Sequence, residues 1–270
     1  MTRLVSVSGG DICDAFRGES DDGSVIFIKK KNRAPAGFFE AEARGLSLLS
    51  EVAGGRLLVP KVLSYDSEQL VLEWLQFGPR NAKADEALGR GLAELHRATL
   101  SDAQRERAQM PGFIGPLPLF NQIEEGVAWS EFFWEHRLRP FLQGLTAVPR
   151  EVEQNFDTLS LRLKSFGVDE EPLSLVHGDM WSGNAGAVGT QPALFDPSSH
   201  LAHREVDLAM MALFGGFSET VWGAYQEAYP LHPGFSERKD LYQLYPVLVH
   251  WALFGSSYCT MVQERIERLL

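Results

Sequence analysis

Residues 175–200 have the sequence LVHGDMWSGNAGAVGTQPALFDPSSH, in which short apolar runs alternate with glycines and polar side chains. Four of the polar groups could bind a cation or accept a proton: His177, Asp179, Asn184 and Asp196. Residues 185–195 predict a turn flanked by two short strands. Such a hairpin would bring Asn184 and Asp196, which flank it, close together. The chain must therefore fold around a cluster of polar groups set between apolar strands.

The spacing of these groups is typical of phosphoryl transfer. That reaction needs a residue to orient the attacking hydroxyl and accept its proton, and oxygen ligands for the Mg²⁺ on the nucleotide. Protein kinases carry a His-x-Asp motif, an Asn five residues after that Asp, and a later metal-binding Asp. Here Asn184 follows Asp179 by five residues, and Asp196 follows twelve later. We predict Asp179 as the proton acceptor and Asn184 and Asp196 as Mg²⁺ ligands, although HGD alone would also suit a simple tight turn.

The first third of the chain predicts strands and one helix. An alternating run at residues 4–7 leads into a glycine pair, Gly9 and Gly10, whose backbone N–H groups could approach phosphate or form a simple turn. Residues 25–28 indicate a strand that could be the antiparallel neighbour of this N-terminal run. Two further short strands are expected before residue 75, the second at 69–74. Gly78 and Pro79 then break the pattern, which places a lobe boundary near residue 76.

A helical pattern begins at Pro35 and places Glu42 on the same face as Phe39 and Leu46. A buried carboxylate is costly unless it is paired with a cation. The strand residue Lys29 shares a face with Phe27, so we predict an ion pair between Lys29 and Glu42. A shift of one residue would make Lys30 the partner.

The rest of the chain predicts mainly helices, at residues 84–100, 129–142, 152–166 and 204–214, and again up to residue 270. Leu88, Leu92 and Leu95 share one face of the first of these helices. His96 lies at the end of the same helix, and we expect it to be partly exposed.

Composition excludes several classes of protein. The formal net charge is -11, which argues against a nucleic-acid partner because duplex-binding proteins usually carry a basic face. No apolar run approaches the roughly 18 residues that span a bilayer. The first residues contain no apolar core of a signal peptide. Two cysteines, Cys13 and Cys259, indicate neither a disulfide framework nor a zinc site. We expect a cytoplasmic protein with no membrane partner.

Several segments resemble one family. HGDMWSGN, FDPSSHLAHREVDLAM and LFGGF are similar to the fructosamine kinase (ketosamine-3-kinase) family, which belongs to the superfamily of protein kinases and aminoglycoside phosphotransferases. FIK at 27–29, FFEAEARGLSLL at 38–49 and YQLYPVLVHWALFG at 242–255 also look like its pattern. The resemblance implies an α+β, two-lobed protein-kinase-like fold. Residues 1–75 would form a small antiparallel-sheet N-lobe that binds the nucleotide, and residues 76–270 a mostly helical C-lobe.

The resemblance also implies roles for individual residues. Lys29 and Glu42 look like the ion pair that holds ATP, and Glu73, Trp74 and Leu75 look like the linker whose backbone binds adenine. Trp181 and His250 are candidates for the pocket that holds the sugar. Asp207 resembles the carboxylate that braces the backbone of the catalytic loop.

The activity that this family implies is transfer of the γ-phosphate of ATP, with Mg²⁺, to the O3 hydroxyl of a free or protein-bound ketoamine, the adduct of a sugar and an amine. Loss of the phosphate would then release the amine, which is deglycation. An alternative is a related small-molecule kinase that phosphorylates an aminoglycoside, choline or another sugar. A third alternative, from a different class, is a pseudokinase-like binding module. We expect a monomer or a weak dimer.

Overall fold

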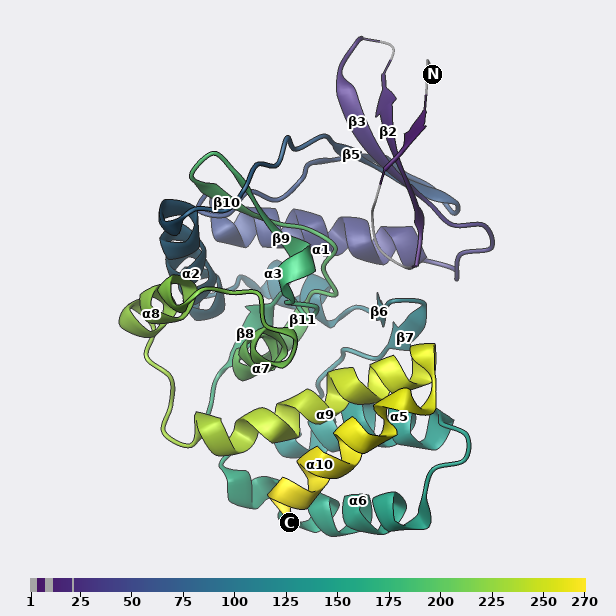
Figure 1. Ribbon diagram of the computed structural model, residues 1–270, viewed down its shortest axis with the longest axis vertical. Helices are drawn as coiled ribbons and strands as arrows, with labels where there is room; N and C mark the ends of the chain where they lie inside the picture. The colour runs from purple at the N-terminus through teal and green to yellow at the C-terminus, as the bar shows by residue number, and fades with distance from the viewer. Residues whose placement is uncertain (1–3, 8–11, 21) are drawn as a thin grey trace.

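The computed structural model describes residues 4–7, 12–20 and 22–270. The chain begins with a five-stranded sheet in the order β1-β2-β3-β5-β4, in which neighbouring strands are antiparallel. Its strands are β1 (Val5–Ser6), β2 (Asp14–Glu19), β3 (Val25–Lys30), β4 (Val62–Tyr65) and β5 (Gln69–Glu73). One long helix, α1 (Phe38–Ala53), packs beside this sheet (Figure 1). The following chain is mostly helical, which confirms the predicted α+β fold.

The N-terminal run differs from its prediction because it supplies two strands. β1 pairs with β2, and β2 then pairs with β3 along its whole length, from Asp14 opposite Lys30 to Glu19 opposite Val25. The second half of β2 is the polar sequence RGE, which carries no apolar alternation. This strand therefore separates the two segments that were expected to be neighbours.

Strand β3 and helix α1 follow the predicted periodicity. Ile26 and Ile28 lie on one face of β3, where they pack with Val71 of β5. The opposite face carries Phe27 and Lys29 toward the cavity described below. Helix α1 buries its apolar face, including Phe39 and Leu46, in the larger core of this region.

The second part of the chain starts with α2 (Ala82–Arg97) and α3 (Asp102–Gln109). The side chain of Asn81 caps α2 by accepting a hydrogen bond from the backbone N–H of Ala84 at 3.1 Å. A short hairpin follows, made of β6 (Gly112–Ile114) and β7 (Leu117–Leu119). The helix expected at 129–142 is present in three pieces: α4 (Trp129–Phe133), a π-helical turn (Trp134–Leu138) and α5 (Arg139–Gly144).

The helix expected at 152–166 is α6 (Arg150–Arg162), which ends in a 3₁₀ turn (Leu163–Phe166). The last third of the chain contains α7 (Glu205–Phe214), α8 (Glu219–Ala228), α9 (Phe235–Phe254) and α10 (Cys259–Leu269). Helices α9 and α10 pack together beside α6, at the end of the molecule opposite the sheet (Figure 1). Within the part of the chain that the structure describes, no helix combines the length and the apolar character that crossing a membrane requires.

The glycine-rich segment forms two nested pairs of antiparallel strands. β9 (Ala185–Val188) and β10 (Gln191–Leu194) pair as predicted, and β8 (Leu173–Val176) pairs with β11 (His200–His203) outside them. Leu175 points into the apolar core below the sheet, whereas its neighbour Val176 points into the core of the C-terminal helices. Strand β8 is therefore held on both faces, which fixes the position of the polar residues that follow it.

Candidate active site

The turn after β8 is held by one buried carboxylate. The backbone N–H groups of His177 and Gly178 donate to the two oxygens of Asp207, at 2.7 and 2.8 Å. Asp207 lies in the first turn of α7 and is fully buried. His96 also contacts it, with 3.1 Å between Nε2 and Oδ2. Burial alone would raise the pKa of Asp207, but these hydrogen bonds and the neighbouring histidines hold that pKa below its usual value. Asp207 thus occupies the bracing position that the family resemblance implied.

Gly178 cannot be replaced at this turn without moving the backbone. Its φ of 81° lies in the left-handed region, and a Cβ there would stand 2.1 Å from the carbonyl oxygen of Ser198. The backbone N–H of Ser198 donates to the carbonyl of His177 at 2.9 Å, and His177 Nε2 lies 3.0 Å from the carbonyl of Phe195. The segments before and after the β9–β10 hairpin are therefore locked together.

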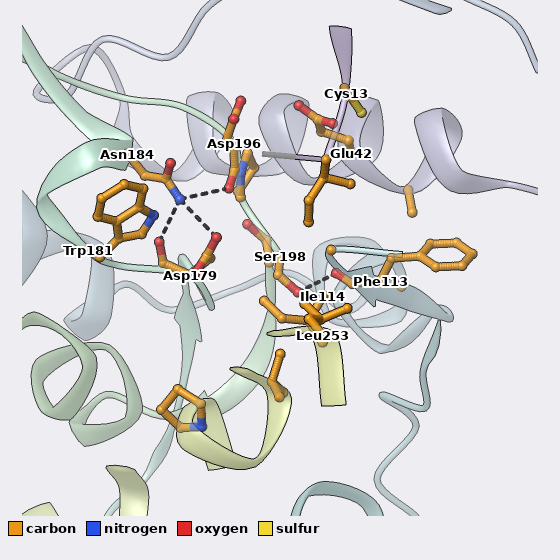
Figure 2. A pocket seen from close by; sticks show the side chains of 18 of the residues that line it. Cys13, Glu42, Phe113, Ile114, Asp179, Trp181, Asn184, Asp196, Ser198 and Leu253 are labelled. Carbon is orange, nitrogen blue, oxygen red and sulfur yellow. Dashed lines mark hydrogen bonds between the residues drawn. The ribbon is translucent and has the colours of Figure 1, made fainter. Parts of the chain in front are cut away.

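Asp179 follows this turn and faces the cavity. Its Oδ2 accepts a hydrogen bond from Nδ2 of Asn184 at 3.0 Å, and the same amide donates to the Asp179 carbonyl at 2.9 Å (Figure 2). Burial raises the pKa of Asp179 to about 7; the hydrogen bond from Asn184 opposes the shift, and the charge of Asp196 adds to it. A carboxyl group with so high a pKa at the edge of a cavity is typical of a group that accepts or donates a proton during catalysis.

Asn184 and Asp196 lie together as predicted. Asn184 Nδ2 is 3.4 Å from the carbonyl oxygen of Asp196. Because this nitrogen is directed at Asp179 and Asp196, the amide oxygen is left available to a cation. Asp196 has a φ of 56°, a left-handed conformation that costs about 1–3 kcal/mol in a residue other than glycine and that is common at functional sites.

Lys29 bridges two carboxylates. Its Nζ lies 2.7 Å from Oε1 of Glu42 and 2.6 Å from Oδ1 of Asp196. The predicted contact with Glu42 is confirmed, and Lys29 rather than Lys30 makes it. Burial opposes the charge on Lys29, but the two carboxylates outweigh burial and raise the pKa above its usual value. The contact with Asp196 joins strand β3 of the sheet to the segment that contains Asp179, Asn184 and Asp196.

These groups line one cavity of ≈ 460 Å³, a volume within the usual range for small-molecule sites. The charged and polar side chains that line it include Lys29, Glu42, Asp179, Asn184 and Asp196, together with Arg44 and Ser198. Trp181 and His250, the two residues expected at the sugar, line it as well. The ring of Trp181 is 41% exposed and covers Gly183, where a Cβ would lie 2.1 Å from the indole. Nδ1 of His250 bonds the carbonyl of Pro246 at 2.7 Å.

The residues expected at the nucleotide base lie apart from this cavity. Glu73, Trp74 and Leu75 are at the end of β5, and none of them is among the lining residues. The Glu73 side chain accepts a hydrogen bond from the backbone N–H of Lys61 at 2.9 Å. Trp74 has its ring centroid 6.4 Å from that of Phe27, which does line the cavity. Gly9 and Gly10 lie outside the described residues.

Two features were missed or mispredicted from the sequence. His96 is 2% exposed rather than partly exposed, because α8 covers this end of α2 and supplies Tyr225, whose hydroxyl is 2.8 Å from His96 Nδ1. Gly89 allows the close approach, since a Cβ there would lie 2.3 Å from the carbonyl of Val221. The cavity wall also holds two buried hydroxyls, of Ser199 and Tyr245, that have no hydrogen-bond partner among the described residues. The sequence carries no periodic signal for either group.

Asn184 and Asp196 form a donor set that suits Mg²⁺. They offer one amide oxygen and one carboxylate, both hard oxygen ligands. No cluster of three or more His, Cys, Asp or Glu residues that could hold a metal occurs in the described part of the chain. A site with so few protein ligands fits Mg²⁺, which commonly takes its remaining ligands from phosphate and water.

The family described as Fructosamine kinase matches residues 1–270. A probable ketoamine kinase from Synechocystis sp. is 36% identical, over 98% of this chain and 89% of that protein. The structure of a fructosamine-3-kinase candidate from Thermobifida fusca is 34% identical and superposes with a TM-score of 0.84, covering 99% of this chain and 93% of the other.

Proteins with much lower sequence identity share this fold. An ADP-bound aminoglycoside phosphotransferase superposes with a TM-score of 0.67 at 14% identity, covering 100% of this chain and 95% of the other. At that identity the similarity shows the kinase-like fold and nothing about the acceptor.

Proposed function

Because this chain belongs to the fructosamine kinase family, and is a kinase, we propose that it transfers the γ-phosphate of ATP to the O3 hydroxyl of a ketoamine. The observation that carries the proposal is that Asp179, Asn184, Asp196 and Lys29 line a single cavity. Together they supply a proton acceptor, two oxygen ligands and a cation, which are the parts that phosphoryl transfer needs.

Asp179 acts on the acceptor. Its carboxylate accepts the proton of the O3 hydroxyl as the oxygen forms a bond to the γ-phosphorus. The bond between that phosphorus and the oxygen bridging to the β-phosphate breaks, and ADP leaves with the electron pair. Asn184 orients Asp179 for this role through the hydrogen bond of 3.0 Å to Oδ2. The raised pKa of Asp179 makes it a stronger base than an exposed carboxylate once it is ionised.

Lys29 acts on the phosphates. It projects from β3 into the cavity, where Glu42 fixes its position. Its charge would stabilise the phosphate oxygens as the transition state forms. Asn184 and Asp196 would hold Mg²⁺, which neutralises charge on the phosphates when bound.

The cavity favours a ketoamine over an aminoglycoside. Among the described lining residues the carboxylates are Glu42, Asp179 and Asp196, and the first and last of these are paired with Lys29. A polycationic aminoglycoside would need several free carboxylates, whereas Asp179 is the one described lining carboxylate that is not paired with Lys29. Choline remains an alternative acceptor, because aromatic side chains also suit a quaternary ammonium group. The presence of all three catalytic carboxylate and amide groups argues against a binding module without activity.

We further propose that residues 1–75 and 76–270 act as two lobes with ATP between them. The backbone of residues 73–75, which joins β5 to the helical part, would bind adenine. Gly9 and Gly10 are proposed to approach the phosphates. The cytoplasmic location and the monomeric or weakly dimeric state expected from the sequence also stay predictions.

The test is ATP consumption with Mg²⁺ on fructose-lysine, ribulose-lysine and erythrulose-lysine, with kanamycin and choline as further acceptors. An Asp179→Ala variant runs in parallel, and NMR of the product locates the phosphate. Turnover of a ketoamine at O3 that is lost in the variant supports the proposal and ranks the sugars. Silence on every ketoamine, with turnover of kanamycin or choline, would overturn the acceptor and keep the roles of Asp179, Asn184 and Asp196.

A further inference from the structure

Four aromatic side chains form a continuous wall on one side of the cavity. The ring of His250 has its centroid 4.9 Å from Phe214, 5.5 Å from Phe254 and 5.3 Å from Tyr258. Phe214 ends α7, His250 and Phe254 lie one turn apart near the end of α9, and Tyr258 is in the turn that follows. All four line the cavity that contains Asp179. We call these residues the aromatic wall.

Folding alone does not account for the exposure of this wall. Phe214 is 37% exposed and Phe254 is 49% exposed, whereas Tyr242, Tyr245 and Trp251 of α9 are buried. Exposed aromatic side chains that gather on the side of a cavity mark a ligand-binding surface. The occupant must reach Asp179 as well, because the wall and Asp179 share one cavity.

The wall carries no positive charge that would repel a cation. Burial lowers the pKa of His250, so its ring is neutral at neutral pH. Its Nδ1 lies 2.7 Å from the carbonyl oxygen of Pro246, and a carbonyl can only accept a hydrogen bond. The proton is therefore on Nδ1, and Nε2 carries a lone pair that can accept one. The structure gives Nε2 no hydrogen-bond partner among the described residues.

We propose that the aromatic wall binds the protonated secondary amine of the ketoamine, so that the cavity selects aminoketoses over neutral sugars. This inference rests on the proposed function. A ketoamine carries its nitrogen on carbon 1 and the reacting hydroxyl on carbon 3, so both groups enter the same cavity when O3 reaches Asp179. The ammonium group faces the rings of Phe214, Phe254 and Tyr258, and one of its N–H groups donates to His250 Nε2.

The wall could instead hold the carbon chain of the amine by apolar contact alone, and a matched pair of acceptors separates the two cases. One acceptor is 1-butylamino-1-deoxyribulose, which is cationic. The other is 1-butylthio-1-deoxyribulose, in which a neutral sulfur replaces the amine at nearly the same size. The quantity to measure is the ratio of kcat/KM for the amine to kcat/KM for the thioether, at saturating ATP.

We expect the wild-type protein to prefer the amine by about 3- to 30-fold, the range that cation–π contacts support. Phe254→Leu keeps apolar bulk and removes the aromatic face, so kcat/KM should fall more for the amine than for the thioether, and the ratio should fall toward 1. Phe254→Trp should keep or raise the ratio, and it tests the wall independently if the leucine variant is unstable. Phe120→Leu is the matched control, since Phe120 is 45% exposed and does not line the cavity.

Two results would overturn the inference. One is a wild-type ratio near 1, and the other is an equal loss of both substrates in Phe254→Leu, which would mean apolar contact alone. Failure of the proposed function looks different, because neither ribulose derivative would then be phosphorylated while kanamycin or choline is. In that case the same variants are compared on choline and its neutral isostere 3,3-dimethylbutan-1-ol, and a ratio that does not respond to Phe254→Leu rejects the wall as a cation site.

Discussion

Asp179 and Asp207 both contact the turn after β8, but their pKa values are shifted in opposite directions. Asp207 receives two backbone N–H groups and a contact from His96, and these hold its pKa below the usual value. Asp179 receives one amide N–H from Asn184, and burial raises its pKa to about 7. Both carboxylates are buried, so the hydrogen-bond donors and the charged groups around each one decide which stays ionised and which can take up a proton.

Buried polar groups on the two sides of residues 177–198 also differ in how fully they are hydrogen-bonded. Away from the cavity, two buried ion pairs form, Arg238 with Glu205 at 2.7 Å and Arg204 with Glu171 at 3.2 Å. On the cavity side, the buried hydroxyls of Ser199 and Tyr245 have no partner among the described residues. Buried polar groups that have hydrogen-bond partners stabilise the fold. Buried polar groups without partners at a cavity are available to bind a ligand.

The largest expected effect comes from removing the charge of Asp179. Asp179→Asn should lower kcat about 10²- to 10⁴-fold, because the amide cannot accept the proton of the acceptor hydroxyl. It should also raise the melting temperature at pH 8, since folding no longer buries a carboxylate with a raised pKa. Steady-state kinetics and thermal melting test both halves. A variant that loses activity and also melts earlier would show that Asp179 supports the fold, as Asp207 does.

The opposite result is expected at Asp207. Asp207→Ala leaves the N–H groups of His177 and Gly178 buried without an acceptor, so the free energy of unfolding should fall by about 3–5 kcal/mol. Asp207→Asn keeps one acceptor oxygen and should lose less. Urea unfolding at pH 7 measures both. If the alanine variant were as stable as the wild type, the bracing role of Asp207 would be wrong.

Two buried histidines near this turn lack the carboxylate that His96 has. Burial lowers the pKa of His200 and of His203 to about 3. Between pH 3 and about 6.5 the unfolded chain therefore binds protons that the folded protein excludes. Stability is full above pH 6.5 and is lost as the pH falls, by about 2 kcal/mol for each histidine between pH 7 and pH 5.

Urea unfolding at these two pH values measures the loss. Protonation of Asp179, whose pKa is about 7, adds stability over the same range and offsets part of the loss in the wild type. His203→Gln should therefore lose about 2 kcal/mol less than the wild type between pH 7 and pH 5, and His232→Ala, at an exposed position, should behave as the wild type. An equal pH dependence in His203→Gln and the wild type would contradict the neutral, buried state of His203.

The smallest effect concerns two tyrosine hydroxyls three residues apart on α9. Tyr242 accepts from Trp129 at 3.3 Å and lies 2.8 Å from His203, whereas the Tyr245 hydroxyl has no partner in the described chain. Tyr242→Phe should lower the free energy of unfolding by about 1 kcal/mol, and Tyr245→Phe should leave it unchanged or raise it by up to about 1 kcal/mol. Equal losses in thermal melting would mean that Tyr245 has a structural partner.

Patterns within a few residues of one another predicted the features that depend on short-range periodicity and turn residues. The ion pair of Lys29 and Glu42 followed from strand parity and helix periodicity, and the β9–β10 hairpin followed from its turn residues. The burial of His96 did not, because it depends on α8, which lies more than a hundred residues later and approaches through Gly89. Strand β2 was also not predicted. It is stabilised by backbone pairing with β3, although its sequence lacks apolar alternation.

The two short contacts of Lys29 have a consequence for how ligands bind. Without ligands, Lys29 is already neutralised by Glu42 and by Asp196, so a polyphosphate that arrives alone competes with Asp196 for the ammonium group. If Asp196 binds Mg²⁺ and Lys29 binds the phosphates, as proposed, a divalent cation on Asp196 would release Lys29 to the phosphates. A polyphosphate on Lys29 would likewise release Asp196 to the cation. Each ligand should thus raise the affinity of the other by the same factor, as thermodynamic linkage requires. One lysine between two acids would make this protein a detector of the metal–nucleotide complex rather than of either component.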